Sequence, residues 1–362
     1  MKIGIITKIG KNYGALLQAY ALKKTIEDYS IESHIIKYTP KNSKRTYCIC
    51  KYKWGVRGFI ANIKSLVHFR SIKRGSKKML QFREKYFSFV GSYDSNEALT
   101  KNPPNMDKYV TGSDQVWNPL LSFDSAYYLD FISSDLNVVK ASYAASIGLK
   151  AIPKEYENEF IKRLRKMDYI TVREANAKQI LDSYDLKSSV VPDPTLLLTN
   201  KEWDDIMIKP KTTEKYILCY FVSYKDEYKK IVDKIQEILG YKVINLMTSE
   251  ESSKVGDIKI RDASVEEFIG LFKYADFIVT SSFHGTIFSI IYEKNFCSMV
   301  YKQTSSRLTE LLESFNLSSR IVHDYNEKEL LDITKKDCVY DEKLKNDIRK
   351  NGLKAVETII KL

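Results

Sequence analysis

The sequence predicts an α/β protein with two Rossmann-like domains whose parallel sheets face a central cleft. With 362 residues, the chain is too long for one ordinary domain. Short apolar runs that suit strands alternate with amphipathic helical patterns through both halves. Within residues 275–299, a strand, a turn, a short helix and a second strand follow one another, and such a crossover joins parallel neighbours.

The first half opens like a nucleotide-binding fold. We expect strands over residues 2–7, 33–38, 106–112, 141–148, 169–172 and 189–191, and helices over 15–28, 155–167 and 175–183. Between the first strand and helix, Asn12 and Gly14 could present backbone donors to an anion. No dinucleotide fingerprint or P-loop is present, and Gly14 could serve only to let the chain turn.

Residues 41–90 carry the basic excess of the chain. They contain fourteen lysines and arginines against one acidic residue, Glu84, while the whole chain has a net charge of +12. Apolar and aromatic residues recur there at roughly helical spacing, which predicts two amphipathic basic helices joined near Gly75. The segment is either a solvated helical excursion or a surface for anionic lipid headgroups or a lipid-linked substrate. Nucleic acid is not expected, because no recognition motif accompanies the charge.

The second half repeats the alternation. We expect strands over residues 216–222, 242–245, 258–260, 277–280 and 296–300, and helices over 225–239, 264–274, 286–292, 305–315 and 343–360. The expected domains are residues 1–200 and 201–340, with residues 341–362 as a last helix that packs back on the first domain. Two such halves describe a GT-B-like architecture.

A polar turn follows the strand at 277–280. Ser281, Ser282, His284 and Gly285 lie in it, and Thr286 begins the next helix. Open α/β sheets bind ligands at the carboxyl ends of their strands, and helix N-termini favour anions. His284 would therefore point into a binding site; alternatively, a serine caps the helix and His284 is a surface histidine.

Two further strand ends in the first half carry polar side chains. Ser113, Asp114 and Gln115 follow the strand at 106–112, which predicts a binding loop there. Arg173 follows the strand at 169–172 and could bind an anion, or could pair with Glu174 or Asp168 at the surface.

Several classes of protein are not expected. No apolar run is long enough for a transmembrane helix, and the first residues do not resemble a signal peptide. Cys48 and Cys50 form a lone C-x-C without a partner pair, so no zinc site is expected, and reduced thiols fit a cytoplasmic protein.

Several motifs, in order, resemble those of the polysaccharide pyruvyl transferase family. They cover nearly the whole chain and comprise residues 12–20 (NYGALLQAY), 112–118 (GSDQVWN), 141–146 (ASYAAS), 172–174 (VRE), 193–196 (DPTL), 281–286 (SSFHGT) and 306–308 (SRL). The resemblance implies a GT-B fold and no metal or other cofactor. It implies transfer of the enolpyruvyl group of phosphoenolpyruvate onto two sugar hydroxyls as a ketal, with release of phosphate. It also implies a role in bacterial capsule, exopolysaccharide or cell-wall polymer synthesis, with a free or lipid-linked saccharide acceptor.

The resemblance assigns roles to the candidate residues. His284 would be the general acid, and Asp114 could be the base for the attacking hydroxyl or a structural residue. The remaining candidates would bind donor or acceptor: Asn12, Gly14, Ser113, Gln115, Arg173, Ser281, Ser282, Gly285, Thr286 and Arg307. Asp193 is expected to be a turn residue between two prolines.

One position departs from the family pattern. Relatives often carry an arginine two residues before the histidine, where this chain has Ser282. Arg173, Arg307 or a lysine could replace it as the donor's anion partner. Two other functions stay open: a GT-B glycosyltransferase that uses a nucleotide-sugar, and a non-catalytic protein of polysaccharide assembly.

Overall fold

The computed structural model describes residues 1–40, 68–133, 135–300 and 306–362. The chain forms two compact units, Met1–Leu197 with Arg349–Leu362, and Leu198–Ile348. Both are α/β units with parallel sheets, as predicted. In the described part of the chain, no helix has the length and apolar character needed to cross a membrane.

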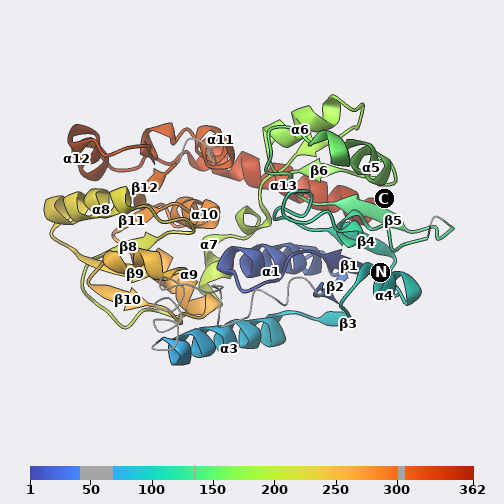
Figure 1. Cartoon of the computed structure of the whole chain (residues 1–362), viewed down its shortest axis with the longest axis horizontal. Helices are drawn as coiled ribbons and strands as arrows, with labels where there is room; N and C mark the ends of the chain where they lie inside the picture. The colour runs from blue at the N-terminus through green and yellow to red at the C-terminus, as the bar shows by residue number, and fades with distance from the viewer. Residues whose placement is uncertain (41–67, 134, 301–305) are drawn as a thin grey trace, which may run out of the picture. The chain divides into compact units, whose positions relative to one another are not determined.

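The first unit is built on a five-stranded parallel sheet with the order β3-β2-β1-β4-β5 (Figure 1). Its strands are β1 (Lys2–Ile6), β2 (Glu32–Tyr38), β3 (Phe89–Tyr93), β4 (Lys108–Thr111) and β5 (Val139–Ser142). A two-stranded parallel sheet of β6 (Thr171–Val172) and β7 (Ser189–Val190) follows. The helices are α1 (Tyr13–Glu27), α3 (Phe69–Tyr86), α4 (Asn96–Lys101), α5 (Lys154–Leu164) and α6 (Ala175–Asp182), with short 3₁₀ turns η2 (Ser125–Tyr128) and η3 (Pro194–Leu196).

The second unit contains a six-stranded parallel sheet with the order β10-β9-β8-β11-β12-β13. Its strands are β8 (Tyr216–Tyr220), β9 (Lys242–Leu246), β10 (Ile258–Ile260), β11 (Phe277–Thr280), β12 (Asn295–Met299) and β13 (Ile321–Val322). The helices are α7 (Asn200–Asp204), α8 (Asp226–Leu239), α9 (Val265–Tyr274), α10 (Phe283–Ile291), α11 (Ser306–Ser314) and α12 (Glu327–Lys335). The last helix, α13 (Glu342–Lys361), begins in this unit and continues into the first. Two 3₁₀ turns, η4 (Glu250–Lys254) and η5 (Ser318–Arg320), complete the unit.

Each sheet has one topological switch point. In the first unit the chain passes from β1 outward to β2 and β3, then returns to β4 on the other side of β1. In the second unit it passes from β8 to β9 and β10, then returns to β11 on the other side of β8. Loops diverge between β1 and β4 and between β8 and β11, and open sheets bind ligands at such places.

The basic segment differs from its prediction. A single helix, α3, runs through Gly75, which is buried, and it does not break there. Phe89 continues the helical spacing but begins the edge strand β3, which the sequence pattern did not reveal. The part of the first expected helix that precedes residue 68 lies outside the described residues, as do Cys48 and Cys50.

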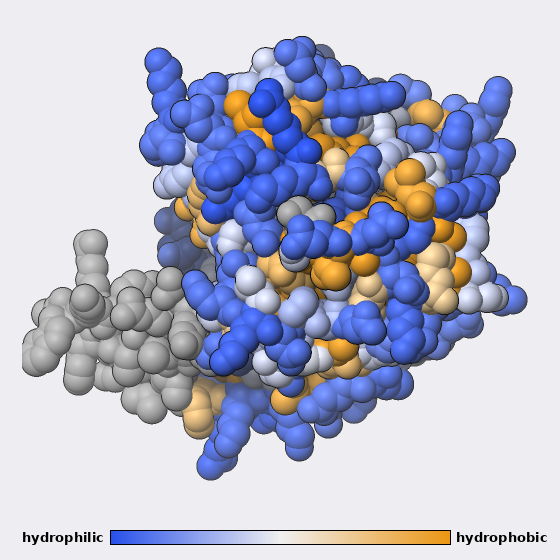
Figure 2. Space-filling model, turned by 90° about the vertical axis from the view of Figure 1, so that its right-hand side faces the viewer, coloured by the Kyte–Doolittle hydropathy of each residue, from blue (hydrophilic) through white to orange (hydrophobic). Residues whose placement is uncertain are grey.

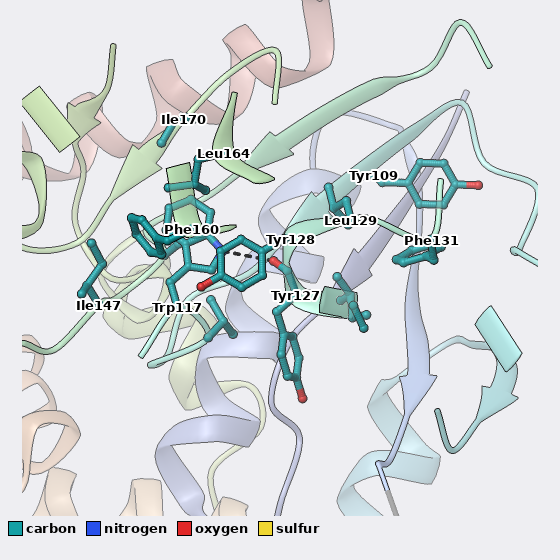
Figure 3. Close-up of a cluster of buried hydrophobic side chains, with 14 of the residues drawn as sticks. Tyr109, Trp117, Tyr127, Tyr128, Leu129, Phe131, Ile147, Phe160, Leu164 and Ile170 are labelled. Carbon is teal, nitrogen blue, oxygen red and sulfur yellow. Dashed lines mark hydrogen bonds between the residues drawn. The ribbon is translucent and has the colours of Figure 1, made fainter. Parts of the chain in front are cut away.

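The loop at 112–118 is more deeply packed than predicted. Trp117 is completely buried and stacks on Tyr128, and its indole nitrogen donates a 3.1 Å hydrogen bond to the Tyr127 carbonyl (Figure 3). Phe160 and Leu164 of α5 complete this part of the core. Trp117 therefore anchors the loop and is not part of a binding surface.

Hydrophilic residues cover most of the face seen in Figure 2.

The last helix returns to the first unit. Buried Lys108 on β4 donates to the Ile359 and Ile360 carbonyls at 3.1 and 2.8 Å. Arg349 donates to the Leu197 carbonyl at 2.6 Å. Gly352 lies where a β-carbon would come within 2.5 Å of the Leu197 side chain, so the helix needs a glycine for this close approach.

Candidate functional site

The turn after β11 brings the second unit's candidate residues to its switch point. Ser281 follows β11 and its hydroxyl donates a 2.9 Å hydrogen bond to the carbonyl of Ser223, which follows β8. The α10 N-terminus therefore lies at the divergence of β8 and β11. A helix N-terminus is a position at which the helix dipole favours an anion.

Helix α10 begins earlier than the sequence predicted. Ser282 is its N-cap and accepts a 3.2 Å hydrogen bond from the Gly285 amide. Phe283, His284 and Gly285 consequently belong to the first turn of the helix and not to the preceding loop. The capping serine satisfies an amide that would otherwise lack an acceptor, which moves the start of the helix toward β11.

Three candidate residues of this turn have clear structural contacts. Ser282 is almost fully buried by its capping role, and Thr286 exchanges a 2.9 Å hydrogen bond with Ser298 on β12. A β-carbon at Gly285 would lie 2.4 Å from Thr280 Oγ1, so α10 approaches β11 through a position that only glycine fits. These contacts build the turn; whether the residues also bind substrate stays a prediction.

His284 differs from these neighbours. It is the second residue of α10 and is half-buried, with its ring set edge-on to Phe283 at 5.4 Å between centroids. Its side chain thus stands at the helix N-terminus beside the switch point of the sheet. Imidazole is the side chain that most readily exchanges protons near neutral pH, so this arrangement can deliver a proton to a bound anion.

The first unit's candidate loops also meet at a switch point. Thr7, which follows β1, donates a 2.9 Å hydrogen bond to the carbonyl of Ser113, which follows β4. Asn12 is the N-cap of α1, and its side chain accepts from the Gly14 and Ala15 amides at 2.8 and 3.4 Å. Gly14 is therefore the second residue of the helix and not part of the predicted turn.

Asp114 has a strained backbone within this loop. Its φ is +73°, in the left-handed region, and its carboxylate accepts from the Gln115 amide at 2.7 Å. Its carbonyl accepts from the Ser146 amide at 3.0 Å, which fixes the loop against the end of β5. Asp114 and Gln115 are half-buried, while Ser113 is fully buried. Left-handed aspartates persist where the surrounding structure holds them, often at functional sites.

Arg173 lies in a buried ionic network. Its guanidinium contacts Asp193 at 2.8 Å and Glu174 at 3.2 Å, and all three side chains are at most 6% exposed. Burial alone would lower the arginine pKa, but Glu174, Asp193 and Asp114 outweigh it and raise that pKa. Two carboxylates already counter the positive charge of Arg173. These contacts give no support to the hypothesis that Arg173 binds the donor, and that hypothesis stays a prediction.

The network joins four of the motifs named above. Ser113 donates to Asp193 at 3.0 Å, and Ser146 donates to Glu174 at 2.6 Å. Asp193 is also the N-cap of η3, where it accepts from the Thr195 amide and hydroxyl. Residues 112–118, 141–146, 172–174 and 193–196 thus converge on one buried cluster. Asp193 is a turn residue as predicted, and it is also the principal partner of Arg173.

Sequence reasoning missed Lys8. It follows β1 at the switch point, and its ammonium donates to the Gln115 carbonyl and lies 5.9 Å from the centre of the Tyr127 ring. Burial lowers its pKa, against the opposing effect of the Asp114 and Asp124 carboxylates. Its position directly after the first strand could have identified Lys8 as a candidate. Lysines are common beside glycine turns, so the position alone did not distinguish it.

Arg307 lies in the first turn of α11 and is half-buried. Within the described residues, no group of three or more histidine, cysteine, aspartate or glutamate side chains is placed to hold a metal ion.

The model of the family described as polysaccharide pyruvyl transferase matches residues 12–303. Comparison with curated proteins gave no match.

Among solved structures, UDP-GlcNAc 2-epimerase from Methanocaldococcus jannaschii is similar at a TM-score of 0.57 and 16% identity over 100% of both chains. The enzyme from Neisseria meningitidis bound to UDP-GlcNAc is similar at 0.57 and 12%, again over 100% of both chains. At these identities the likeness shows the two-unit α/β fold alone.

Proposed function

Because this chain belongs to the polysaccharide pyruvyl transferase family, we propose that it transfers the enolpyruvyl group of phosphoenolpyruvate onto two hydroxyls of a sugar. The product is a ketal in a bacterial surface polysaccharide, and phosphate is released. The observation that carries the proposal is His284, which stands at a helix N-terminus on a sheet switch point. That place suits a ligand with a phosphate and a carboxylate.

The proposed reaction begins with a proton. His284 donates it to the methylene carbon of phosphoenolpyruvate, which leaves C2 electron-poor, and a sugar hydroxyl attacks that carbon. A second hydroxyl then displaces phosphate at C2 and closes the ketal; its proton returns to His284, and the departing phosphate carries away the proton taken from the first hydroxyl. The amides of the first turn of α10 would stabilise the negative charge of the donor throughout.

The loop at the first unit's switch point is proposed to bind the acceptor. Asp114 takes the proton of the attacking hydroxyl, and Gln115 and Asn12 offer amide groups that suit sugar hydroxyls. Buried Ser113 holds the loop in place through Asp193. Lys8, which follows β1, adds a positive charge at the same switch point.

A nucleotide-sugar is the second candidate donor. Ser282, which occupies the position where relatives often carry arginine, is a buried helix cap and supplies no charge for a donor anion. The similar Neisseria meningitidis enzyme is described as bound to UDP-GlcNAc. Arg307 or a lysine would otherwise have to replace the arginine.

A donor panel separates the two candidates. We expect phosphoenolpyruvate to raise the melting temperature and to release phosphate in the presence of a suitable saccharide, with the ketal detected by mass spectrometry. Stabilisation by UDP or UDP-GlcNAc, without phosphate release from phosphoenolpyruvate, would favour the nucleotide-sugar reaction.

Peripheral association with an anionic membrane belongs to the same proposal. A lipid-linked acceptor would be reached at the inner membrane face, and residues 41–90 carry a strong excess of positive charge.

A further inference from the structure

We infer that α3 is a membrane-docking helix that inserts an apolar stripe, Phe69, Ile72 and Leu80, among anionic lipid headgroups. The inference rests on the proposed function only for its purpose, which is access to a lipid-linked acceptor. One side of α3 would contact the bilayer. Its apolar side chains would insert shallowly, and its basic side chains would be attracted to the anionic headgroups.

The inner side of α3 is anchored to the first unit. The Tyr20 ring of α1 lies 5.9 Å from Phe82 and 5.3 Å from Tyr86, both in edge-on geometry, and Gly75 is buried on the same side. These contacts fix which side of the helix faces outward. Because α3 cannot turn about its own axis, the same side chains always face outward.

The outer side carries unusual apolar exposure. Phe69, Ile72 and Leu80 are 36%, 48% and 48% exposed. At about 100° per residue they fall within an arc of about 80° on one flank of the helix, centred about 110° around from the packed residues Gly75 and Phe82. Half-buried Ser76 and Arg83 lie within the same arc. Single exposed apolar residues are ordinary, but three aligned along one helix mark a surface for an apolar partner.

Positive charge borders this stripe. Lys73 and Lys77 follow it around the helix, and Arg70 and Arg74 lie beyond them; all four are exposed. Glu84 is the only acidic residue of α3. An apolar stripe bordered by lysine and arginine is the pattern of helices that lie in the interface of an anionic bilayer. A soluble acidic partner or a nucleic acid would need the charge but would not need the aligned apolar side chains.

Vesicle binding of the full chain tests the inference. The wild-type protein should cosediment with phosphatidylcholine vesicles that contain about a third phosphatidylserine at low salt, and should remain in solution with phosphatidylcholine alone. The triple variant Arg70→Gln, Lys73→Gln, Lys77→Gln should bind about a hundredfold more weakly, because each basic residue contributes about fivefold. The matched control Lys229→Gln, Lys230→Gln, Lys259→Gln removes three exposed charges from α8 and β10 and should bind like the wild type.

A second pair of variants separates insertion from attraction alone. Ile72→Ser with Leu80→Ser keeps every charge and should bind about tenfold more weakly or worse. In Leu80→Trp, the introduced tryptophan should shift its emission to the blue and be quenched by bromolipids only with anionic vesicles. Both positions are exposed, so neither variant should disturb folding.

Three outcomes would overturn the inference. One is a wild-type protein that stays in solution with the anionic vesicles at low salt. Another is full binding by the Ile72→Ser, Leu80→Ser variant, which would show that α3 is attracted to the anionic headgroups without inserting apolar side chains. The third is self-association of the wild type, abolished by the same variant, which would make the stripe a contact between copies of this chain. Phosphate release with a water-soluble acceptor reports on the proposed function independently, because that assay needs no membrane.

Discussion

At the scale of single residues, His284 is the proposed proton donor, whereas its neighbours in the same turn make contacts that build the fold. It is half-buried at the second position of α10, whereas Ser282 caps the helix and Thr286 ties it to β12. Replacing it should therefore affect chemistry more than folding.

We expect His284→Ala to lose activity about a hundredfold or more, because a positioned proton donor contributes that much, while its melting temperature stays within a few degrees. Phosphate release followed directly measures the first quantity and thermal unfolding the second. His34→Ala, which removes a half-buried histidine from β2, is the matched control and should keep full activity. Near-normal turnover in His284→Ala would remove His284 from the mechanism.

Arg173 allows a sharper distinction between two roles. Removing a partner from a buried ion pair leaves an uncompensated charge, and here Asp193 and Glu174 would both lose their cation. Arg173→Ala should therefore lower the free energy of unfolding by about 3–5 kcal/mol in urea titration. Arg165→Ala, at an exposed position of the same unit, should change it by less than about 0.5 kcal/mol.

The conservative variant then separates structure from binding. If Arg173 binds the donor, Arg173→Lys should raise the donor KM with unfolding unchanged, because lysine keeps the charge but loses the fork. If Arg173 holds the motif cluster together, Arg173→Lys should lose stability, with the donor KM unchanged. The two results exclude each other.

At the scale of elements, the approach of α10 to β11 depends on Gly285. Thr280 Oγ1 donates to the Tyr220 carbonyl at 2.7 Å and accepts from the Ser282 amide at 3.1 Å, so it cannot yield to an added methyl group. The β-carbon of an alanine would lie 2.4 Å from that oxygen. The helix would have to move away from the strand, and His284 would move with it.

Gly285→Ala should accordingly destabilise the protein by about 1–3 kcal/mol and reduce turnover together with stability. Gly10→Ala, where no atom lies within 4 Å of the added carbon, is the control and should be close to neutral. In a double-mutant cycle, Thr280→Ala should recover part of the loss by removing the crowded oxygen. Strictly additive effects of the two substitutions would contradict the steric account.

The elements also show where sequence reasoning succeeds. Strand β11 has the predicted bounds, and the helix predicted over 264–274 is α9, which Ser264 and Glu267 cap, because both features depend on neighbouring residues. Phe89 was misassigned because its spacing continues the pattern of α3, although pairing with β2 places it in a strand. Buried Gly75 continues α3 because the inner side of that helix packs against α1.

The candidate site was predicted in position but not in its contacts. His284, Asp114 and Asn12 follow strands in the sequence, and the structure places them at switch points of the sheets. Glu174 was one of the two ion-pair partners named for Arg173 from the sequence, and the structure contains that pair. Asp193 and Ser113 could not be predicted as partners, since they lie 20 and 60 residues away along the chain. The burial of Trp117 could not be predicted, because a tryptophan after a strand suits a binding loop and a core equally well.

At the scale of the whole molecule, α13 ties the end of the chain to the first unit. Lys108 on β4 donates to the last carbonyls of the helix, which have no intrahelical partner, and its charge suits the negative end of the helix dipole. Tyr29 of the first unit lies 3.2 Å from Glu357, and Gly352 permits close contact with Leu197. The helix is therefore held at its middle and at its end.

Lys108→Met keeps the apolar stem but removes the donor, so the carbonyls of buried Ile359 and half-buried Ile360 lose their partner. We expect a loss of about 1–3 kcal/mol in the free energy of unfolding. Hydrogen exchange should become faster in residues 349–362, while α8 in the second unit keeps its protection, because the lost contact is local to the first unit. Lys343→Met, at an exposed position near the start of α13, should change neither quantity. Unaltered exchange at 349–362 in Lys108→Met would show that side-chain packing alone holds α13. The hydrogen bonds of Lys108 would then serve only to compensate the burial of its ammonium group.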